Sequence, residues 1–258
     1  MKFSVLASGS GGNACYVETE TASILVDAGL SCREIERRLQ SVGVEAGRLD
    51  ALIITHEHSD HIKGAGPVAR RFGLPIYTNR RTLEKGVKTL GPLAQTVIIQ
   101  NGEPFSINGL TVHPFTKCHD AADPFGLVIS SGDKRIGLAT DLGRSTNLVE
   151  NVLRECQALV MEFNYDPAML EDGPYPLDIK RRIKGAEGHL SNIQGAELLR
   201  SVYHEGLDCV VIAHLSKINN HPEKAYSAAL KALHSCCSLE RVKIVISEQD
   251  EPIPMIEV

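Results

Sequence analysis

The sequence predicts a single α/β (α+β) domain over residues 1–258, in which two β-sheets are faced by helices. The first indication is the order of elements, because the chain has two β-rich stretches and each is followed by helices. The second is that no Pro- or Ser-rich linker and no charged tail divides these stretches. The third is composition, since 43% hydrophobic and 23% charged residues are ordinary for a globular protein. In such an arrangement the apolar faces of the strands and helices are buried against each other, which makes a stable domain.

The first half of the chain begins with three short apolar segments that predict a β-meander. They cover residues 3–7, 14–17 and 23–27. A helix over 31–42 is expected next, because Ile35, Leu39 and Val42 recur at helical spacing and Ser31 can act as its N-cap. The continuous apolar run over 51–55 predicts a strand buried on both faces. A helix over 61–72, a strand over 75–78 and a helix over 80–90 are expected to follow.

The second half returns to a β pattern before it becomes mixed. Strands are expected at 96–99, 105–107, 110–116, 125–130 and 135–140. The dipeptide Asn108-Gly109 and the segment 131–133 have the chemistry of hairpin turns. The last third is expected to contain helices at 145–156, 176–184, 191–204 and 222–235, and strands at 158–163, 209–213 and 242–247.

Charge and cysteine content restrict the class of protein. The chain has 27 Lys and Arg against 32 Asp and Glu, a formal net charge of −5, so any polyanionic partner must be bound by a local patch. Seven cysteines, an odd number, indicate a reduced protein and a cytoplasmic location. The N-terminal apolar run is too short for a secretory signal, and no apolar run reaches the roughly 18 residues of a membrane span. We therefore expect no membrane contact.

Four potential metal ligands lie within six residues directly after the predicted strand at 51–55. They are His56, His58, Asp60 and His61. Imidazoles two residues apart on an extended segment point the same way and can bind one cation together. Asp60 and His61 lie where the chain turns into the next helix, so they face a neighbouring position. A carboxylate beside imidazoles suits Zn²⁺, Mn²⁺ or Fe rather than Ca²⁺.

Three further candidate ligands lie at or just beyond the ends of predicted strands. These are His119, Asp141 and His214. Taken alone, each is an ordinary polar residue at a strand end. Strand ends converge at one edge of a sheet, and a two-metal site needs about this many additional ligands. We therefore interpret the three residues, together with the histidine cluster, as metal ligands.

Two loops contain residues that are candidates for binding phosphate. Ser8-Gly-Ser10-Gly-Gly-Asn13 joins the first two predicted strands. It is either a turn whose glycines permit positive φ or a nest of backbone N–H groups near a phosphate. The second loop, 188–192, precedes a helix that Ser191 can cap.

The ligand pattern resembles the metallo-β-lactamase superfamily. The resemblance rests on the order and spacing of His56-x-His58-x-Asp60-His61, His119, Asp141 and His214, and on Asp27 within the segment 25–29. Several longer sequence segments resemble one subfamily, the YycJ/WalJ-type exonucleases. These segments are residues 8–13, 119–124, 163–166, 188–192 and 214–216, with Asn219-Asn220. The superfamily motifs are specific for fold, and the subfamily segments identify a nuclease by resemblance.

The resemblance implies a fold and a cofactor. The fold is an αββα sandwich of two mixed β-sheets flanked by helices, and the cofactor is a pair of divalent metal ions, Zn²⁺ or Mn²⁺ with Fe as an option. Carried over residue by residue, His56, His58 and His119 hold one ion, Asp60, His61 and His214 hold the other, and Asp141 bridges them. Asp27 orients a ligand through hydrogen bonds. Asp141 also disfavours β-lactamase activity, because enzymes with that activity often have Cys at this place.

A basic run in the chain is expected to attract a polyanion. Residues 180–184 supply four cations immediately before the 188–192 loop, and Arg181 and Arg182 are expected to hold the backbone of the substrate. The other arginine pairs are interpreted as solvated helix faces. They are Arg37-Arg38, Arg70-Arg71 and Arg80-Arg81.

Catalytic and phosphate-binding roles are assigned to seven residues. Related phosphodiesterases of this fold carry a His-Ser pair where this chain has His189, so His189 is expected to act as an acid or a phosphate ligand. Asp60 is expected to orient the attacking water in addition to binding metal. Ser191 and Asn192, with Ser8, Ser10 and Asn13 of the first loop, are expected to receive a terminal phosphate.

These observations predict a dinuclear-metal-dependent phosphodiesterase that acts on nucleic acid. The resemblance narrows this to a 5′-to-3′ exonuclease for DNA rather than RNA, which releases 5′-mononucleotides in DNA repair or processing. The alternative is a glyoxalase-II-like thioester or lactone hydrolase with the same ligands. A third option is a redox or nucleic-acid-binding protein with structural metals, but 5% aromatic residues and no Trp leave few stacking platforms. The sequence carries no signal for an oligomeric state.

Overall fold

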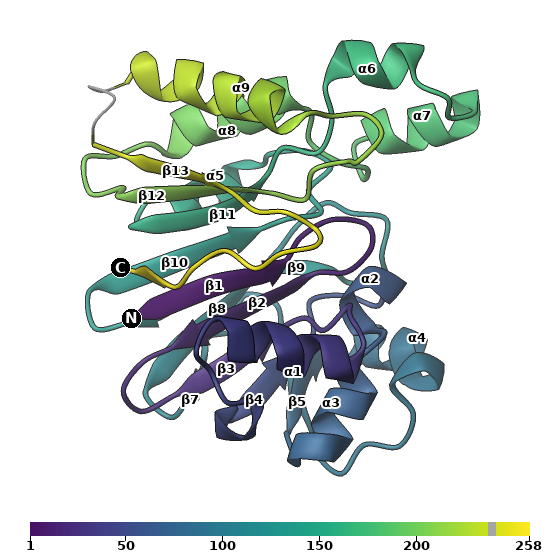
Figure 1. The fold of residues 1–258 in the computed structure, drawn as a ribbon, viewed down its shortest axis with the longest axis vertical. Helices are drawn as coiled ribbons and strands as arrows, with labels where there is room; N and C mark the ends of the chain where they lie inside the picture. Colours follow the sequence, from purple (N-terminus) through teal and green to yellow (C-terminus); the bar gives the residue numbers. More distant parts are fainter. Residues whose placement is uncertain (237–240) are drawn as a thin grey trace.

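Two seven-stranded β-sheets pack face to face, and helices cover the outer side of each (Figure 1). The computed structural model describes residues 1–236 and 241–258. The arrangement confirms the predicted αββα sandwich of two mixed sheets. Within these two ranges, none of the helices is long and apolar enough to cross a membrane.

The first sheet contains the strands of the N-terminal half and one from the C-terminus. They are β1 (Lys2–Ala7), β2 (Ala14–Glu18), β3 (Ser23–Val26), β4 (Ala51–Ile53), β5 (Ile76–Asn79), β6 (Thr96–Ile99) and β14 (Ile256–Glu257), in the order β14-β1-β2-β3-β4-β5-β6. The first three form the predicted antiparallel meander, and β3 to β6 are parallel. Helices α1 (Cys32–Ser41), α3 (Ala65–Phe72) and α4 (Arg80–Leu90) pack on its outer side, with η1 (Ala46–Arg48) and α2 (Ser59–Ile62) between them in the chain.

The second sheet begins with hairpins and ends with parallel strands. Its strands are β7 (Phe105–Ile107), β8 (Leu110–Thr116), β9 (Phe125–Ser131), β10 (Lys134–Ala139), β11 (Ala158–Glu162), β12 (Cys209–Ala213) and β13 (Lys243–Ile246), in the order β13-β12-β11-β10-β9-β8-β7. Helices α5 (Asn147–Leu153), α8 (Asn192–Val202) and α9 (Pro222–His234) cover its outer side. Helices α6 (Pro167–Asp172) and α7 (Leu177–Lys184) lie beyond the strand ends (Figure 1).

Strand β4 explains why the apolar run at 51–55 is continuous. Ala51 and Ile53 belong to the cluster between the two sheets, whereas Leu52 and Ile54 belong to the cluster under the helices. All four side chains are 0% exposed. Successive side chains of a strand point to opposite faces, so a strand covered on both sides needs apolar residues at every position. The prediction of a strand buried on both faces is confirmed.

The predicted helix over 61–72 is wrong as a single element, because the chain forms α2 and α3 with a break between them. Pro67 lacks an N–H and is tolerated only in the first turn of a helix, so a new helix starts at Ala65. At the break, a Cβ on Gly64 would lie 1.8 Å from the Leu30 carbonyl oxygen, which shows how closely the two backbones approach. Three short elements, η1, α6 and β14, were not predicted.

Candidate metal centre

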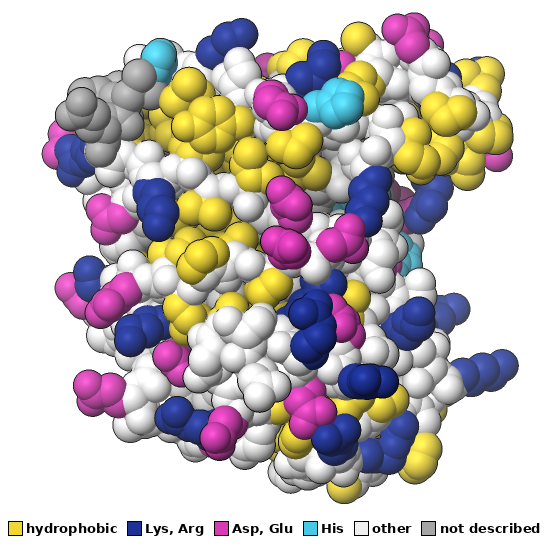
Figure 2. All heavy atoms as spheres, in the orientation of Figure 1, with side chains coloured by type: hydrophobic (Ala, Val, Ile, Leu, Met, Phe, Trp, Pro, Cys, Tyr) yellow, Lys and Arg dark blue, Asp and Glu magenta, His cyan; other side chains and the backbone are white. Residues whose placement is uncertain are grey.

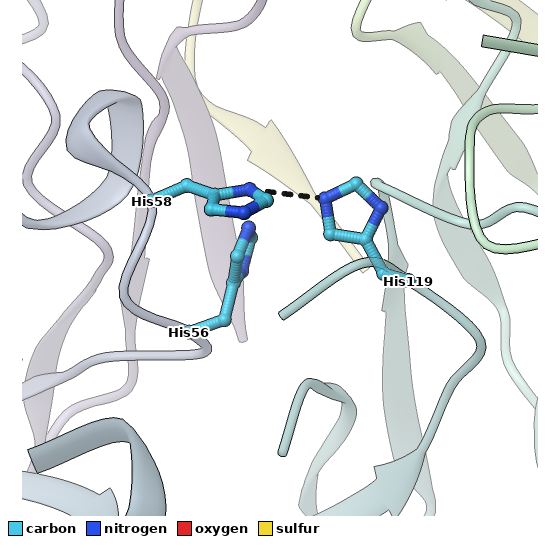
Figure 3. Close-up of side chains that lie close together, drawn as sticks. All are labelled: His56, His58 and His119. Carbon is cyan, nitrogen blue, oxygen red and sulfur yellow. Dashed lines mark hydrogen bonds between the residues drawn. The ribbon is translucent and has the colours of Figure 1, made fainter. Parts of the chain in front are cut away.

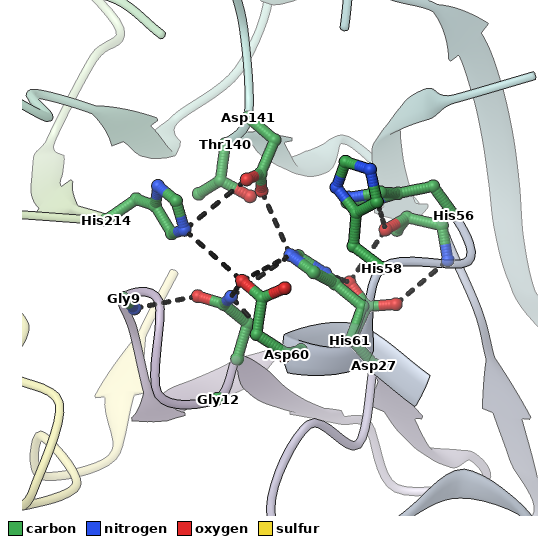
Figure 4. A network of polar contacts seen from close by, with 12 residues as sticks. Gly9, Gly12, Asp27, His56, His58, Asp60, His61, Thr140, Asp141 and His214 are labelled. Carbon is green, nitrogen blue, oxygen red and sulfur yellow. Dashed lines mark hydrogen bonds and ion pairs between the residues drawn. The ribbon is translucent and has the colours of Figure 1, made fainter. Parts of the chain in front are cut away.

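The candidate site lies at one edge of the sandwich, where strands of both sheets end (Figure 4). Asp27 follows β3, Asp141 follows Thr140 at the end of β10, and His214 follows β12. All three have left-handed backbone conformations, with φ of 59°, 52° and 57°. Such conformations cost about 1–3 kcal/mol in non-glycine residues and cluster at functional sites. The strands predicted to run on through Asp27 and Thr140 therefore stop earlier, and the turns direct their polar side chains toward a common centre.

Three histidines form the first group of ligand atoms, which we call position one (Figure 3). It consists of His56, His58 and His119, each of which offers a ring nitrogen within 4.8 Å of the others. The opposite ring nitrogens of His58 and His119 donate to the carbonyl oxygens of Asp120 (3.2 Å) and Gly188 (3.1 Å). A carbonyl can only accept, so the inward nitrogens of these two rings keep their lone pairs free for a metal.

A second group, position two, lies beside the first and contains carboxylates (Figure 4). It consists of Asp60, His61 and His214, and its ligand atoms lie within 4.8 Å of one another and of Asp141. Asp141 lies between the positions, because its oxygens are 3.2 Å from His61 Nε2, 3.3 Å from His214 Nε2 and 3.8 Å from His119 Nε2. The Nδ1 atom of His61 is 2.7 Å from Asp27 Oδ2. Asp27 thus has the orienting contact that the resemblance implied.

The residues present fit a pair of divalent cations. His56 Nε2, Asp141 Oδ2 and His214 Nε2 are buried, and although Asp141 lies 3.2–3.3 Å from the nitrogens of His61 and His214, none of the three atoms makes a hydrogen bond of good geometry with a described residue. Buried polar atoms are almost always satisfied, so atoms without a partner that converge on one space indicate a missing ligand. Imidazoles with carboxylates are donors that Zn²⁺, Mn²⁺ and Fe accept.

The two positions differ in the pKa of their imidazoles. At position one, burial lowers the pKa of His56 well below its usual 6.5 and that of His119 to about 4. At position two, burial acts in the same direction, but neighbouring carboxylates, Asp141 first among them, raise the pKa of His61 to about 10 and that of His214 well above 6.5. Burial raises the pKa of Asp141, and the charges of His214 and His61 outweigh this and hold it well below 3.8. Without metal, His61 and His214 therefore retain protons that His56 and His119 lack.

Glu162, at the end of β11, is a site residue that the sequence analysis missed. It is 0% exposed, and its Oε1 accepts hydrogen bonds from His189 Nδ1 (2.8 Å) and His214 Nδ1 (2.9 Å). Its Oε2 accepts from the backbone N–H groups of Leu142 and Leu190. Burial raises the pKa of this carboxyl, but His189 and His214 lower it to about 2. Glu162 is thus an ionised carboxylate that orients two histidines.

The signal for Glu162 was present in the sequence. It is the one charged residue in the apolar run at 158–163, which was interpreted only as a strand. A charge buried in such a strand must be paired, so it predicts partners of opposite charge or a hydrogen-bond network. The identity of those partners depends on the tertiary structure.

His189 faces the candidate site as predicted. Its side chain is 19% exposed, and its ring centroid lies 5.2 Å from those of both His119 and His214. Because Nδ1 donates to Glu162, Nε2 is the ring atom available to a substrate. The pair of His189 and Glu162 has the geometry of an oriented acid or base.

The 8–13 loop is not the open phosphate nest that the sequence analysis considered. Five of its six amide groups, those other than Ser10, have partners inside the protein, including Gly9 N to Asn13 Oδ1 and Gly11 N to Gln249 Oε1. The Ser8 hydroxyl accepts from the backbone N–H of His214 (2.7 Å), and Asn13 Nδ2 donates to Asp60 Oδ2 (3.1 Å). Ser8 and Asn13 therefore hold ligand residues in place, and Ser10 is exposed.

The predicted phosphate contacts at 191–192 are also engaged within the protein. Ser191 is the N-cap of α8 in a capping box with Gln194, and Asn192 exchanges side-chain hydrogen bonds with Asn220. Both residues are buried. Their physical role is to fix the start of α8 behind His189 rather than to present donors to solvent.

The basic run on α7 contributes one side chain to the site. Arg182 donates through Nε to Asp120 Oδ2 (2.5 Å), and Asp120 adjoins His58 and His119. Arg181 is exposed. The run thus lies at the mouth of the site, but Arg182 is held by a carboxylate there.

Comparison with known proteins agrees with this geometry. Residues 22–214 match the family described as the beta-lactamase superfamily domain. The chain is 36% identical over 235 residues to exodeoxyribonuclease YycJ of Bacillus anthracis, covering 90% of this chain and 89% of that protein. It is also 36% identical over 236 residues to exodeoxyribonuclease WalJ of Streptococcus pneumoniae serotype 2, covering 90% and 88%.

A solved structure supports the fold independently. YhfI from Bacillus subtilis, a metallo-beta-lactamase fold protein, superposes with a TM-score of 0.75 over 98% of both chains, at 18% identity. This likeness establishes the architecture, and the two longer sequence matches establish the subfamily. The chain therefore belongs to the metallo-β-lactamase superfamily of metal-dependent hydrolases, and within it to the YycJ/WalJ group.

Proposed function

We propose that this chain is a 5′-to-3′ DNA exonuclease that uses two divalent metal ions and releases 5′-mononucleotides. The observation that carries the proposal is the juxtaposition of the Glu162-held His189 with the ligand groups of positions one and two. Such an arrangement places a proton donor beside a centre suited to phosphoryl chemistry. The relatives named exodeoxyribonucleases support DNA as the substrate.

The two ions are assigned to the two positions. Position one would hold one ion and position two the other, with the Asp141 carboxylate between them. When bound, such ions act as Lewis acids on a phosphoryl oxygen and lower the pKa of water. Zn²⁺ and Mn²⁺ are the favoured ions and Fe is an option, because the donor set is imidazole and carboxylate.

The chain's own residues supply the remaining steps. Asp60 lies at position two with an exposed fraction of 19%, where its carboxylate accepts a hydrogen bond from the attacking water and orients it. His189 donates a proton from Nε2 to the departing 3′ oxygen, while Glu162 holds Nδ1 and stabilises the charged ring before transfer. Arg182 lies at the mouth in an ion pair with Asp120, which leaves the exposed Arg181 of the same run to attract the negative backbone.

The competing proposal is a glyoxalase-II-like thioester or lactone hydrolase. The ligand set is common to both, so the ligands do not separate them. The two nuclease-named relatives match 90% of the chain, which favours the nuclease. The proposed 5′-to-3′ direction of digestion rests on the resemblance to YycJ/WalJ-type exonucleases, including the segments at 119–124 and 188–192.

The test uses a linear duplex labelled at either the 5′ or the 3′ end, and a covalently closed circle of the same sequence. Metal-loaded protein should release the 5′ label first, as a mononucleotide, and leave the circle intact. Cleavage of the circle or earlier release of the 3′ label would overturn the exonuclease assignment. Turnover of a glutathione thioester faster than DNA would establish the competing activity instead.

A further inference from the structure

The basic run on α7 has less free charge than its sequence indicates. Lys184 forms an ion pair with the Glu171 carboxylate, and the Lys180 ammonium donates to the Glu171 backbone carbonyl. Arg182 is paired with Asp120. Three of the four cations in this run are therefore already in contact with acceptors of the protein. A substrate with many phosphates needs positive charge from another surface.

Helix α4 is such a surface. Arg80, Arg81, Lys85 and Lys88 are exposed, and none of the four forms an ion pair or a side-chain hydrogen bond with another described residue. Arg81, Lys85 and Lys88 follow the i, i+4, i+7 spacing that places side chains on one helical face. Glu84 is the helix's single acidic residue. We call the four cations the α4 ridge.

The α4 ridge begins at the mouth of the metal centre. Asn79, the N-cap of α4, donates through Nδ2 to the carbonyl of Asp123 (2.6 Å), which lies in the loop that follows His119. Farther along the helix, a Cβ on Gly86 would lie 3.2 Å from Ile62 Cδ1 in α2. Helix α4 is therefore braced against both segments of the first half that supply metal ligands.

The views of the whole molecule agree with this placement. Figure 1 shows α4 and α7 on the same flank, on either side of the edge at which the strands end. In Figure 2, dark-blue Lys and Arg side chains project from this flank over α4, below a hollow in which histidine side chains are visible. A duplex with its end in the hollow would reach α4 if it crossed the lower part of this flank.

We infer that the α4 ridge binds the phosphate backbone of duplex DNA beyond the nucleotide being removed, without regard to sequence. The inference rests on the proposed function and names a surface that positions its substrate. Helix α4 has 11 residues, which span about 16 Å at about 1.5 Å each, while the phosphates of one strand recur about every 3.4 Å along the duplex axis. Several phosphates therefore lie within reach. In a chain of net charge −5, a free basic face also steers a polyanion to the site.

The test compares two variants that each remove four positive charges. The ridge variant is Arg80→Ala, Arg81→Ala, Lys85→Ala and Lys88→Ala. The control is Lys2→Ala, Arg48→Ala, Lys134→Ala and Lys243→Ala, whose residues stand at or before the starts of β1, β4, β10 and β13, at the opposite edge of the sandwich. Circular dichroism and metal content establish that both variants are folded.

Binding is measured by fluorescence anisotropy with a labelled duplex of several helical turns, in EDTA so that no cleavage occurs. The ridge variant should bind about tenfold or more weakly near 50 mM salt, and the slope of log affinity against log salt should be shallower by about 3 to 4, at about 0.9 per phosphate contact. The control should bind like the unmodified protein. A charge-preserving variant, Arg80→Lys with Arg81→Lys, should retain the salt slope.

Three outcomes overturn the inference. One is a ridge variant that binds with the original affinity and slope, and another is a control that loses as much affinity as the ridge variant. The third is a charge-preserving variant whose affinity no longer depends on salt as that of the unmodified protein does. Contacts that depend on charge alone tolerate the replacement of Arg by Lys. If the unmodified protein cleaves DNA and one of these outcomes occurs, only the ridge assignment fails. If the unmodified protein neither binds nor cleaves DNA, the proposed function fails with it.

Discussion

The two halves of the metal centre use similar side chains but differ in their electrostatics. At position one, the outer nitrogens of His58 and His119 meet neutral backbone carbonyls, and burial lowers the pKa of His119 to about 4. At position two, carboxylates surround the imidazoles, and the pKa of His61 is raised to about 10 despite its burial. An ion at position one would thus meet His56 and His119 as neutral imidazoles. An ion at position two must displace protons first.

The source of the difference is the placement of buried carboxylates. Asp27 in the N-terminal half contacts His61, and Glu162 in the C-terminal half contacts His214. Asp141 lies between the positions but nearer to position two, at 3.2 Å from His61 Nε2 against 3.8 Å from His119 Nε2. Each sheet therefore supplies one carboxylate that supports a position-two histidine. Supporting groups of this kind fix ring orientation and increase the basicity of the ligand.

Removal of Asp141 should produce the largest effect, because this residue serves both positions. We expect Asp141→Ala to lose both ions and to reduce DNA cleavage by roughly 10⁴-fold or more, since each Lewis acid contributes several kcal/mol. Metal analysis and initial rates measure the two losses. Asp133→Ala, an exposed Asp in the hairpin at the other end of β10, is the matched control. Retention of one full equivalent of metal in Asp141→Ala would show that the positions are independent.

His189→Ala should separate proton donation from metal binding. The variant should keep its metal content and lose about 10²- to 10⁴-fold in turnover of DNA, the usual scale of general acid catalysis. With bis(p-nitrophenyl) phosphate the loss should be much smaller, because that leaving group needs little protonation. Equal losses on both substrates would assign His189 to phosphate positioning instead.

Much of the fold and the ligand set was predictable from sequence because local patterns encode them. The apolar run at 51–55 and the hairpin dipeptide Asn108-Gly109, whose φ values are 46° and 93°, both formed as predicted. The cluster His56 to His61 and the strand-end residues meet at one edge, since the carboxyl ends of parallel strands converge there.

The residues that were misjudged owe their roles to distant partners. Ser8 has the sequence context of a phosphate loop, yet its hydroxyl holds the backbone of His214, 206 residues away in the chain. Glu162 looked like a single charge in a strand, and its importance appears only when His189 and His214 are placed beside it. Arg182 is likewise held by Asp120, 62 residues away. Local composition carries no record of such pairings.

Glu162→Gln should weaken position two selectively, whereas Asp27→Asn should also affect position one, because Asp27 contacts His61 directly and His56 through the Thr55 hydroxyl. Each change removes the negative charge behind a position-two histidine, His214 or His61, but keeps the shape of the side chain, so we expect affinity for the second ion to fall by roughly 10- to 100-fold. Affinity for the first ion should remain in Glu162→Gln, because the outer contacts of His58 and His119 are with backbone carbonyls. Competition with a chelator of known affinity measures both constants. Equal loss at both positions in Glu162→Gln would contradict the separation of the two supports.

Acidity should affect the two positions unequally. The raised pKa values of His61 and His214 mean that both rings are protonated in the metal-free protein at neutral pH, whereas His56 and His119 are not. Binding of the second ion should therefore displace protons from these rings. For each displaced proton, the affinity for that ion should fall by about tenfold when the pH decreases by one unit. Calorimetry in two buffers of different ionisation enthalpy should show proton release with the second ion and little with the first. Proton release with the first ion alone would reverse the assignment.

The most direct measurement is anomalous diffraction from metal-soaked crystals at two values of pH. At mildly alkaline pH the account predicts two peaks, one among His56, His58 and His119 and the other among Asp60, His61 and His214, with Asp141 between them. At mildly acidic pH the second peak should lose occupancy while the first persists, because burial holds the pKa of His56 well below 6.5 and that of His119 at about 4, whereas the pKa values of His61 and His214 are raised. A single peak at both values of pH, or earlier loss of the ion among the three histidines, would contradict the account.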